Sequence, residues 1–201
     1  MSRARSRVPA PGQLSLGLTD DPIAIRELLV EKLRAGGHRG RLVPEMGLCQ
    51  GEARVDLAAI DTRLDGYEVK SARDDLRRLA AQAAVYGQVF DRVTLVAPSA
   101  HLSAAALQLP EWWGFALVDG GTTTIEIVRS AAPNPQLDLL ATVRLLWRDE
   151  AARLLESHLG RRSSAPRPVL WRRLVDIVPP AELRAAVCRC LMARTGWPTA
   201  G

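Results

Sequence analysis

The hydrophobic positions of this chain begin with the spacing of a helix. Its apolar face comprises Ile23, Ile25, Leu28, Leu29 and Leu33. Asp20 or Asp21 can cap the first turn, Pro22 suits that turn, and Gly36-Gly37 ends the pattern. The sequence therefore predicts one amphipathic helix over about residues 22–35.

From residue 54 the pattern changes to the alternation of strands. One strand is predicted from residue 54 to 59 and a second from about 64 to 71. Two turns compete between them, one at residues 61–63 and one at Asp65-Gly66. We favour the earlier turn, which places Asp56 opposite Glu68 in an antiparallel pair and leaves Gly66 inside the strand as a bend or bulge.

The pattern then alternates between helices and strands. The predicted elements are a helix over 74–89, a strand over 92–97, a helical or looped segment over 99–109, and a hairpin of 115–118 and 122–128. After a boundary at 132–135, helical segments follow at about 137–159, 169–177 and 181–193. We expect a mixed α/β core over residues 19–131 and a C-terminal helical extension over residues 132–201.

Charge and cysteine content indicate which partners, cysteine states and cellular compartment to expect. Residues 1–18 are rich in arginine and proline and are predicted to be a disordered basic tail. The net charge of +5 permits a polyanionic partner without requiring one. Cys49, Cys188 and Cys190 lack disulfide or zinc-site spacing and are predicted to be free thiols. No membrane span or signal peptide is recognisable, so we expect a cytoplasmic protein.

Lysine is rare in this chain, and one lysine has notable neighbours. Of 27 basic residues only two are lysines, Lys32 and Lys70, and Lys70 follows Glu68 by two positions. On a strand this spacing puts both side chains on the same face. A carboxylate and an ammonium group would then share one pocket.

Further polar residues extend this pattern along the chain. Asp56 lies on the preceding strand, and Gln82-x-x-x-Tyr86 lies on the following helix. With this strand–turn–strand–helix context, the sequence resembles the PD-(D/E)XK nuclease superfamily, especially its small single-domain bacterial members and its RecB-like branch. The resemblance covers about residues 28–128, and Val55 replaces the proline of the motif. It implies a restriction-endonuclease-like mixed central sheet flanked by helices.

The resemblance implies a metal-dependent mechanism, and elementary chemistry agrees with it. Mg²⁺ prefers hard oxygen ligands and needs only one or two protein carboxylates. Asp56, Glu68 and the Val69 carbonyl would bind Mg²⁺, with Mn²⁺ as a plausible substitute. Lys70 would orient or deprotonate the attacking water, or offset charge on the phosphate. Gln82 would position the water or the phosphate.

Several supporting assignments are left with alternatives. Glu45, expected near the end of the first helix, would bind metal directly or through water, and Glu52 is its competitor. Tyr86 is expected to be a packed aromatic side chain with its hydroxyl at the rim of the site. Arg78 would contact phosphate or pair with Asp74 on the same helix. Trp112-Trp113 would stack on a base or, as we favour, belong to the core or a lid.

We therefore predict a metal-dependent endo- or exonuclease that acts on DNA in preference to RNA. The alternative is a catalytically silent module on the same fold that binds nucleic acid or a partner protein. A third hypothesis is an accessory protein that dimerises through the C-terminal helices, so a homodimer stays open.

Overall fold

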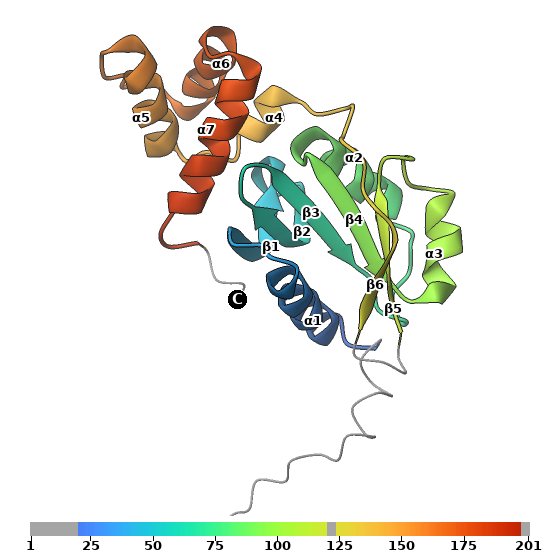
Figure 1. Cartoon of the computed structure of the whole chain (residues 1–201). Coiled ribbons are helices and arrows are strands. Elements are labelled where there is room, and N and C mark those ends of the chain that lie inside the picture. Colours follow the sequence, from blue (N-terminus) through green and yellow to red (C-terminus); the bar gives the residue numbers. More distant parts are fainter. Residues whose placement is uncertain (1–19, 120–123, 198–201) are drawn as a thin grey trace, which may run out of the picture.

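A computed structural model describes residues 20–119 and 124–197, and its centre is a mixed six-stranded sheet (Figure 1). The strands, which lie in the sheet in chain order, are β1 (Arg41–Leu48), β2 (Ala53–Ile60), β3 (Leu64–Val69), β4 (Arg92–Ala97), β5 (Gly114–Val118) and β6 (Ile125–Arg129). The β3–β4 and β4–β5 pairs are parallel and the other pairs are antiparallel. The expected α/β class with a mixed central sheet is confirmed, while the predicted basic tail lies outside the described residues.

Helices cover both faces of the sheet. They are α1 (Pro22–Ala35), α2 (Leu79–Val89), α3 (Ser99–Ala106), α4 (Leu139–Val143), α5 (Arg148–Leu159), α6 (Arg167–Ile177) and α7 (Pro180–Ala193). The helix α1 packs on one face through Ile25 and Leu29. The other face packs against α2, α3 and the C-terminal helices in one continuous apolar cluster. Figure 1 shows α5–α7 grouped beyond the β1–β2 end of the sheet.

The predicted start of α1 is confirmed in detail. The Asp21 side chain accepts a hydrogen bond from the Ile23 backbone N–H at 2.9 Å, and Pro22 occupies the first turn. Asp20, the other candidate cap, forms an ion pair with Arg73 instead. The helix ends before Gly36, as the sequence predicts.

The turn between β2 and β3 lies at residues 61–63, as predicted. The pairs Leu57↔Tyr67 and Ala58↔Gly66 set a register that, extended by one residue, puts Asp56 opposite Glu68. Gly66, however, forms a regular pair and no bulge, so that part of the prediction is wrong. A glycine is needed here because a Cβ would lie only 2.8 Å from the Phe90 ring.

Three elements differ from the sequence prediction. The edge strand β1 was not predicted, although Pro44 suits an edge strand because it donates no backbone hydrogen bond. The helix α2 begins at Leu79 rather than at Asp74. The Asp74 carboxylate accepts hydrogen bonds from Ser71 N and Oγ, both at 2.7 Å, which holds a turn in place of a helix. The single helix expected over 137–159 is divided into α4 and α5.

The C-terminal helices are anchored to the core by polar contacts as well as by the apolar cluster. Asn134 Nδ2 donates to the carbonyls of Gly87 and Phe90, both at 2.7 Å, and so fixes the segment that leads to α4. Arg184 on α7 pairs with Asp91 before β4. Within residues 20–119 and 124–197, no helix has the length and apolar character to cross a membrane.

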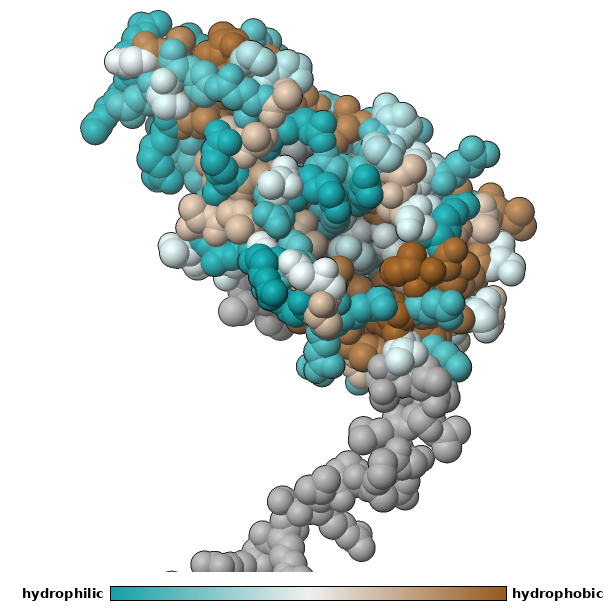
Figure 2. Space-filling view, viewed as in Figure 1, coloured by the Kyte–Doolittle hydropathy of each residue, from teal (hydrophilic) through white to brown (hydrophobic). Residues whose placement is uncertain are grey.

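The surface shows where polar and apolar side chains gather. In Figure 2 hydrophilic residues cover much of the surface around the C-terminal helices, while a hydrophobic patch lies towards the β5–β6 end of the sheet. Ile127 and Val128 on β6 are about half exposed, with relative exposures of 48% and 58%. The three cysteines are free, as predicted. The homodimer stays a prediction.

Candidate active site

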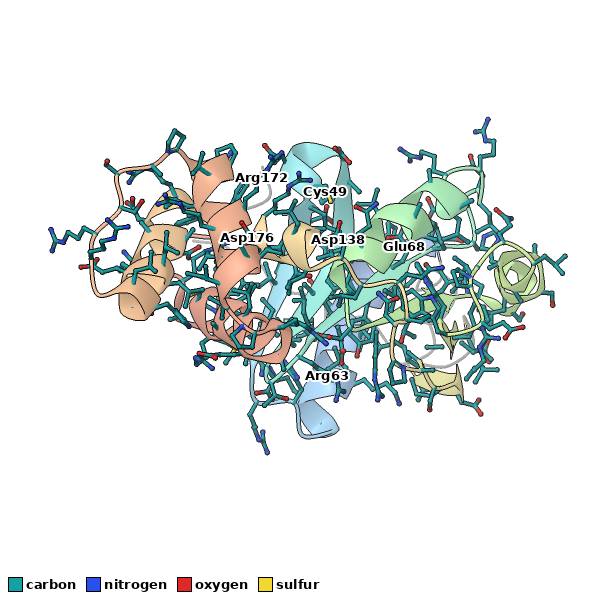
Figure 3. The ribbon with its side chains drawn as sticks, turned by 90° about the horizontal axis from the view of Figure 1, so that it is seen from above. Cys49, Arg63, Glu68, Asp138, Arg172 and Asp176 are labelled. Atoms are coloured by element: carbon teal, nitrogen blue, oxygen red, sulfur yellow. The ribbon has the colours of Figure 1, made fainter. Side chains whose placement is uncertain are left out.

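The buried carboxylate of Glu68 is the centre of the predicted site. It is 1% exposed and lies on β3 under α2 (Figure 3). Its Oε1 accepts hydrogen bonds from Lys70 Nζ at 2.7 Å and from Gln82 Nε2 at 2.6 Å. Its Oε2 lies 2.6 Å from the Tyr86 hydroxyl, which donates to it. The structure thus brings four of the predicted residues together.

Asp56 lies on the neighbouring strand and brings a second carboxylate to the same place. Its Oδ2 accepts a hydrogen bond from the Val69 backbone N–H at 2.7 Å. Burial first, and then the charge of Glu68, raise the pKa of Asp56, which is about 7. The Val69 N–H and the Lys70 ammonium act in the opposite direction. The two carboxylates are therefore close enough to repel each other.

Lys70 and Gln82 complete a hydrogen-bonded group above Glu68. Lys70 directly follows β3, and its backbone N–H donates to the Val96 carbonyl at 2.9 Å, which holds the residue in line with the sheet. Its side chain is largely buried, and Nζ also reaches Gln82 Oε1 at 3.4 Å. The Gln82 amide thus donates to the carboxylate and accepts from the ammonium. An ammonium in this position can bond to a water or a phosphate oxygen as well.

Tyr86 lies deeper than the sequence analysis expected. Its ring is packed, as expected, and stacks on Trp113 with centroids 6.0 Å apart, but its hydroxyl is buried rather than at the rim. The hydroxyl lies 2.7 Å from the Arg54 carbonyl as well as beside Glu68, and burial, followed by the charge of Glu68, raises its pKa. Trp112 and Trp113 belong to the core, as favoured, so base stacking by them is ruled out.

Glu45 occupies a different element from the one expected. It lies on β1 rather than near the end of α1, at the position opposite Asp56 between the pairs Pro44↔Leu57 and Met46↔Val55. Its φ of 53° marks a local distortion of the edge strand. The distortion occurs where β1 faces the candidate site.

The Glu45 carboxylate is occupied by basic partners. It pairs with Arg26 on α1 and, at 3.7 Å, with Arg54 on β2. Its charge still contributes to the raised pKa of Asp56. The competitor Glu52 is exposed beside the short 3₁₀ turn Cys49–Gly51. Arg26 was missed from the sequence because its position in a helix indicated only a solvated basic residue.

Arg78 lies at the N-terminal cap of α2 and is exposed, so it is not in the hydrogen-bonded group around Glu68. The expectation that Asp74 and Arg78 lie on one helix with Gln82 and Tyr86 is wrong, because the helix begins after Arg78. Asp74 bonds to Ser71 rather than pairing with Arg78. Contact between Arg78 and phosphate stays a prediction.

The carboxylate oxygens of Asp56 and Glu68 suit a hard divalent cation that needs few protein ligands. A carboxylate has about four acceptor positions. Glu68 uses three of them and Asp56 uses one in its bond to Val69. Within the described part of the chain, no group of three or more His, Cys, Asp or Glu side chains could hold a metal. Mg²⁺, which keeps several waters and needs only one or two carboxylates, is compatible with this pair. The role of the Val69 carbonyl stays a prediction.

Comparisons with known proteins give a matching family model and one similar solved structure, and neither description states an activity. A family model described as bacteriophage P4 protein cII matches residues 22–196. No curated protein matches the chain. Among solved structures, the SPO1766 protein of unknown function from Silicibacter pomeroyi is 26% identical, with a TM-score of 0.42, over 74% of this chain and 91% of that one. A TM-score this low supports no conclusion about fold or function.

Proposed function

The chain belongs to the family of bacteriophage P4 protein cII, and we propose that it is a metal-dependent nuclease that hydrolyses phosphodiester bonds, in DNA rather than RNA. The family description states no activity, so the proposal depends on the site around Glu68. The observation that carries it is the meeting of two carboxylates, an ammonium and an amide at one place on adjacent strands.

Each group has a task that phosphodiester hydrolysis requires. A divalent cation held by Asp56 and Glu68 would supply Lewis-acid chemistry and neutralise phosphate charge. The Lys70 ammonium is positioned by Glu68 and Gln82, so it can bind and orient a water or stabilise charge on a phosphate oxygen. The Gln82 amide keeps that lysine and the Glu68 carboxylate in fixed positions. The Tyr86 hydroxyl fixes Glu68 from below.

One observation favours the alternative, a catalytically silent module on the same fold. The Glu68 carboxylate has protein donors on both oxygens, so this part of the site is satisfied without a cation. A binding module could keep these hydrogen bonds for stability alone. Activity measurements separate the two functions.

The test is cleavage of end-labelled single- and double-stranded DNA and RNA with Mg²⁺ or Mn²⁺. The wild type is expected to cleave a DNA substrate, and Asp56→Ala and Lys70→Ala are expected to lose this activity. Lys32→Ala is a matched control, because Lys32 is the other lysine of the chain and is exposed on α1. Equal cleavage by all four proteins contradicts the proposal, and binding without cleavage supports the silent module.

A further inference from the structure

A groove of about 530 Å³ runs beside the candidate site, between the sheet edge and the C-terminal extension. One wall is formed by β1, the 3₁₀ turn after it, and Arg54 at the start of β2. The other wall is formed by the segment between α4 and α5, the start of α6 and the residues after α7. Glu45 lies in this groove and opposite Asp56, so the groove begins where the candidate site ends.

The groove is strongly basic. Four arginines line it, Arg54, Arg144, Arg167 and Arg194, against one carboxylate, that of Glu45. Arg194 is neutralised by Glu150. Arg144 and Arg167 are exposed, and the ion pairs found among the described residues include neither of them. An open groove with uncompensated arginines suits a polyanion.

An aromatic side chain lies next to these arginines. Trp147 lines the same groove and is 43% exposed, unlike Trp112, Trp113 and Trp171, which are buried. The Arg194 guanidinium lies 4.3 Å from its ring centroid and holds the ring in place, and that guanidinium is itself anchored by Glu150. A fixed and partly exposed indole beside arginines is the combination that binds unpaired bases and their phosphates.

We infer that this groove binds a single strand of nucleic acid and leads it to the carboxylates of Asp56 and Glu68. Arg144 and Arg167 contact the phosphates, and Trp147 stacks on a base. Stacking needs an unpaired base, which is why the groove takes a single strand rather than a duplex. The path of the strand towards Asp56 and Glu68 rests on the proposed function, because that function places hydrolysis there. Binding in the groove does not depend on it.

Binding without a divalent metal tests this inference separately from cleavage. The probe is a fluorescein-labelled oligothymidine of about 20 nucleotides, measured by anisotropy in EDTA and compared with a duplex of equal length. The wild type is expected to bind the single strand more tightly. A double variant, Arg144→Glu and Arg167→Glu, is expected to weaken binding roughly a hundredfold and to reduce the salt dependence of binding by about two ion contacts.

Two further variants make the test specific. Arg173→Glu is the matched control, because Arg173 is an exposed arginine of α6 that lines a different hollow. It is expected to bind almost as the wild type does. Trp147→Ala is expected to weaken single-strand binding about tenfold without changing the salt dependence. Its thermal unfolding is compared with that of the wild type to confirm that it is folded.

The outcomes distinguish the proposal that the groove binds a single strand from the proposal that the protein is a nuclease. Unchanged binding in the Arg144→Glu, Arg167→Glu variant, or equal weakening by Arg173→Glu, overturns the groove. Tighter binding of the duplex overturns the assignment to a single strand. A wild type that binds in the groove as described but cleaves nothing with Mg²⁺ or Mn²⁺ contradicts the nuclease and leaves the groove in place.

Discussion

Two buried ion pairs of this protein have similar chemistry and different surroundings. In the sheet, Lys70 Nζ lies 2.7 Å from Glu68, and their side chains are 11% and 2% exposed. In the C-terminal extension, Arg194 Nε donates to Glu150 at 2.8 Å, with side chains 4% and 8% exposed. The second pair is enclosed by Trp147 and Trp197, whose ring centroids lie 4.3 and 4.6 Å from the guanidinium.

The difference lies in the balance of charge. Glu150 and Arg194 match each other, and their remaining bonds go to backbone groups, those of Trp147 N and the Leu145 carbonyl. Near Glu68 there are two carboxylates, those of Glu68 and Asp56, and one ammonium, that of Lys70. The pKa of Asp56 rises to about 7, because burial and the charge of Glu68 oppose the ionisation of Asp56. A buried charge alone therefore does not mark a functional site. A buried excess of one sign, as at Asp56 and Glu68, is the feature on which we base the proposed site.

The largest expected effect is on activity, and it comes from Glu68→Gln. This change keeps the shape of the side chain but removes the charge that would help hold a cation. We expect cleavage to fall about a thousandfold, or about 4 kcal/mol in transition-state stabilisation. Stability should change much less, because Asp56 remains as a counter-charge for Lys70. Single-turnover cleavage and chemical denaturation measure the two effects.

The same substitution in the other pair, Glu150→Gln, should give the opposite result. It leaves the buried Arg194 guanidinium without the only carboxylate it pairs with among the described residues. We expect the free energy of unfolding to fall by about 3 kcal/mol. Cleavage per folded molecule at saturating substrate should stay near that of the wild type, because this pair supports Trp147 in the groove and bonds to neither Asp56 nor Glu68. If Glu150→Gln loses cleavage at saturating substrate while remaining folded, the division into a structural and a functional pair is wrong.

The site was largely predictable because its residues are close in sequence or on neighbouring elements. Glu68 and Lys70 share a strand face, and the turn at residues 61–63 fixes Asp56 opposite Glu68. Gln82 and Tyr86 lie about one turn apart on the same helix, so they face the same side. The pairing of Arg26 with Glu45 was not predictable in this way, because it depends on how α1 and the unpredicted strand β1 pack together.

The fold was predictable to the extent that local patterns determine it. Alternating positions identified β2, a short apolar run identified β4, and an apolar face with capping residues identified α1. The start of α2 was placed five residues too early, because Asp74 bonds to Ser71 in a turn that helix periodicity does not reveal. The break between α4 and α5 depends on Glu150, which accepts the Trp147 N–H and pairs with the distant Arg194.

The gain in stability on metal binding is a smaller expected effect. It distinguishes the surroundings of Glu68 from the Glu150–Arg194 pair without any nucleic acid. At a Mg²⁺ or Mn²⁺ concentration a hundred times the dissociation constant, the wild type should gain about 2.7 kcal/mol of stability. The Asp56→Asn, Glu68→Gln double variant should gain none, because both carboxylates are removed. Thermal unfolding with and without metal measures the gain.

Glu150→Gln is the matched control for the metal experiment. It loses stability in the absence of metal but should gain as much from the metal as the wild type does, because the Glu150 side chain bonds to Arg194 and to the Trp147 N–H and not to Asp56 or Glu68. An equal gain in the Asp56→Asn, Glu68→Gln variant would show that the metal binds elsewhere, and would remove the cation from the proposed mechanism.

The smallest expected effect concerns the backbone that supports the pair of Glu68 and Lys70. Gly66 lies two residues before Glu68, and a Cβ there would lie 2.8 Å from the buried Phe90 ring. Gly66→Ala should therefore cost about 2 kcal/mol of stability, because the strand or the fully buried ring would have to shift. The matched control is Gly47→Ala on β1, where a Cβ meets nothing within 4 Å. If both variants unfold at the same denaturant concentration, Phe90 does not restrict β3, and the position of Glu68 must depend on its hydrogen bonds to Lys70, Gln82 and Tyr86 alone.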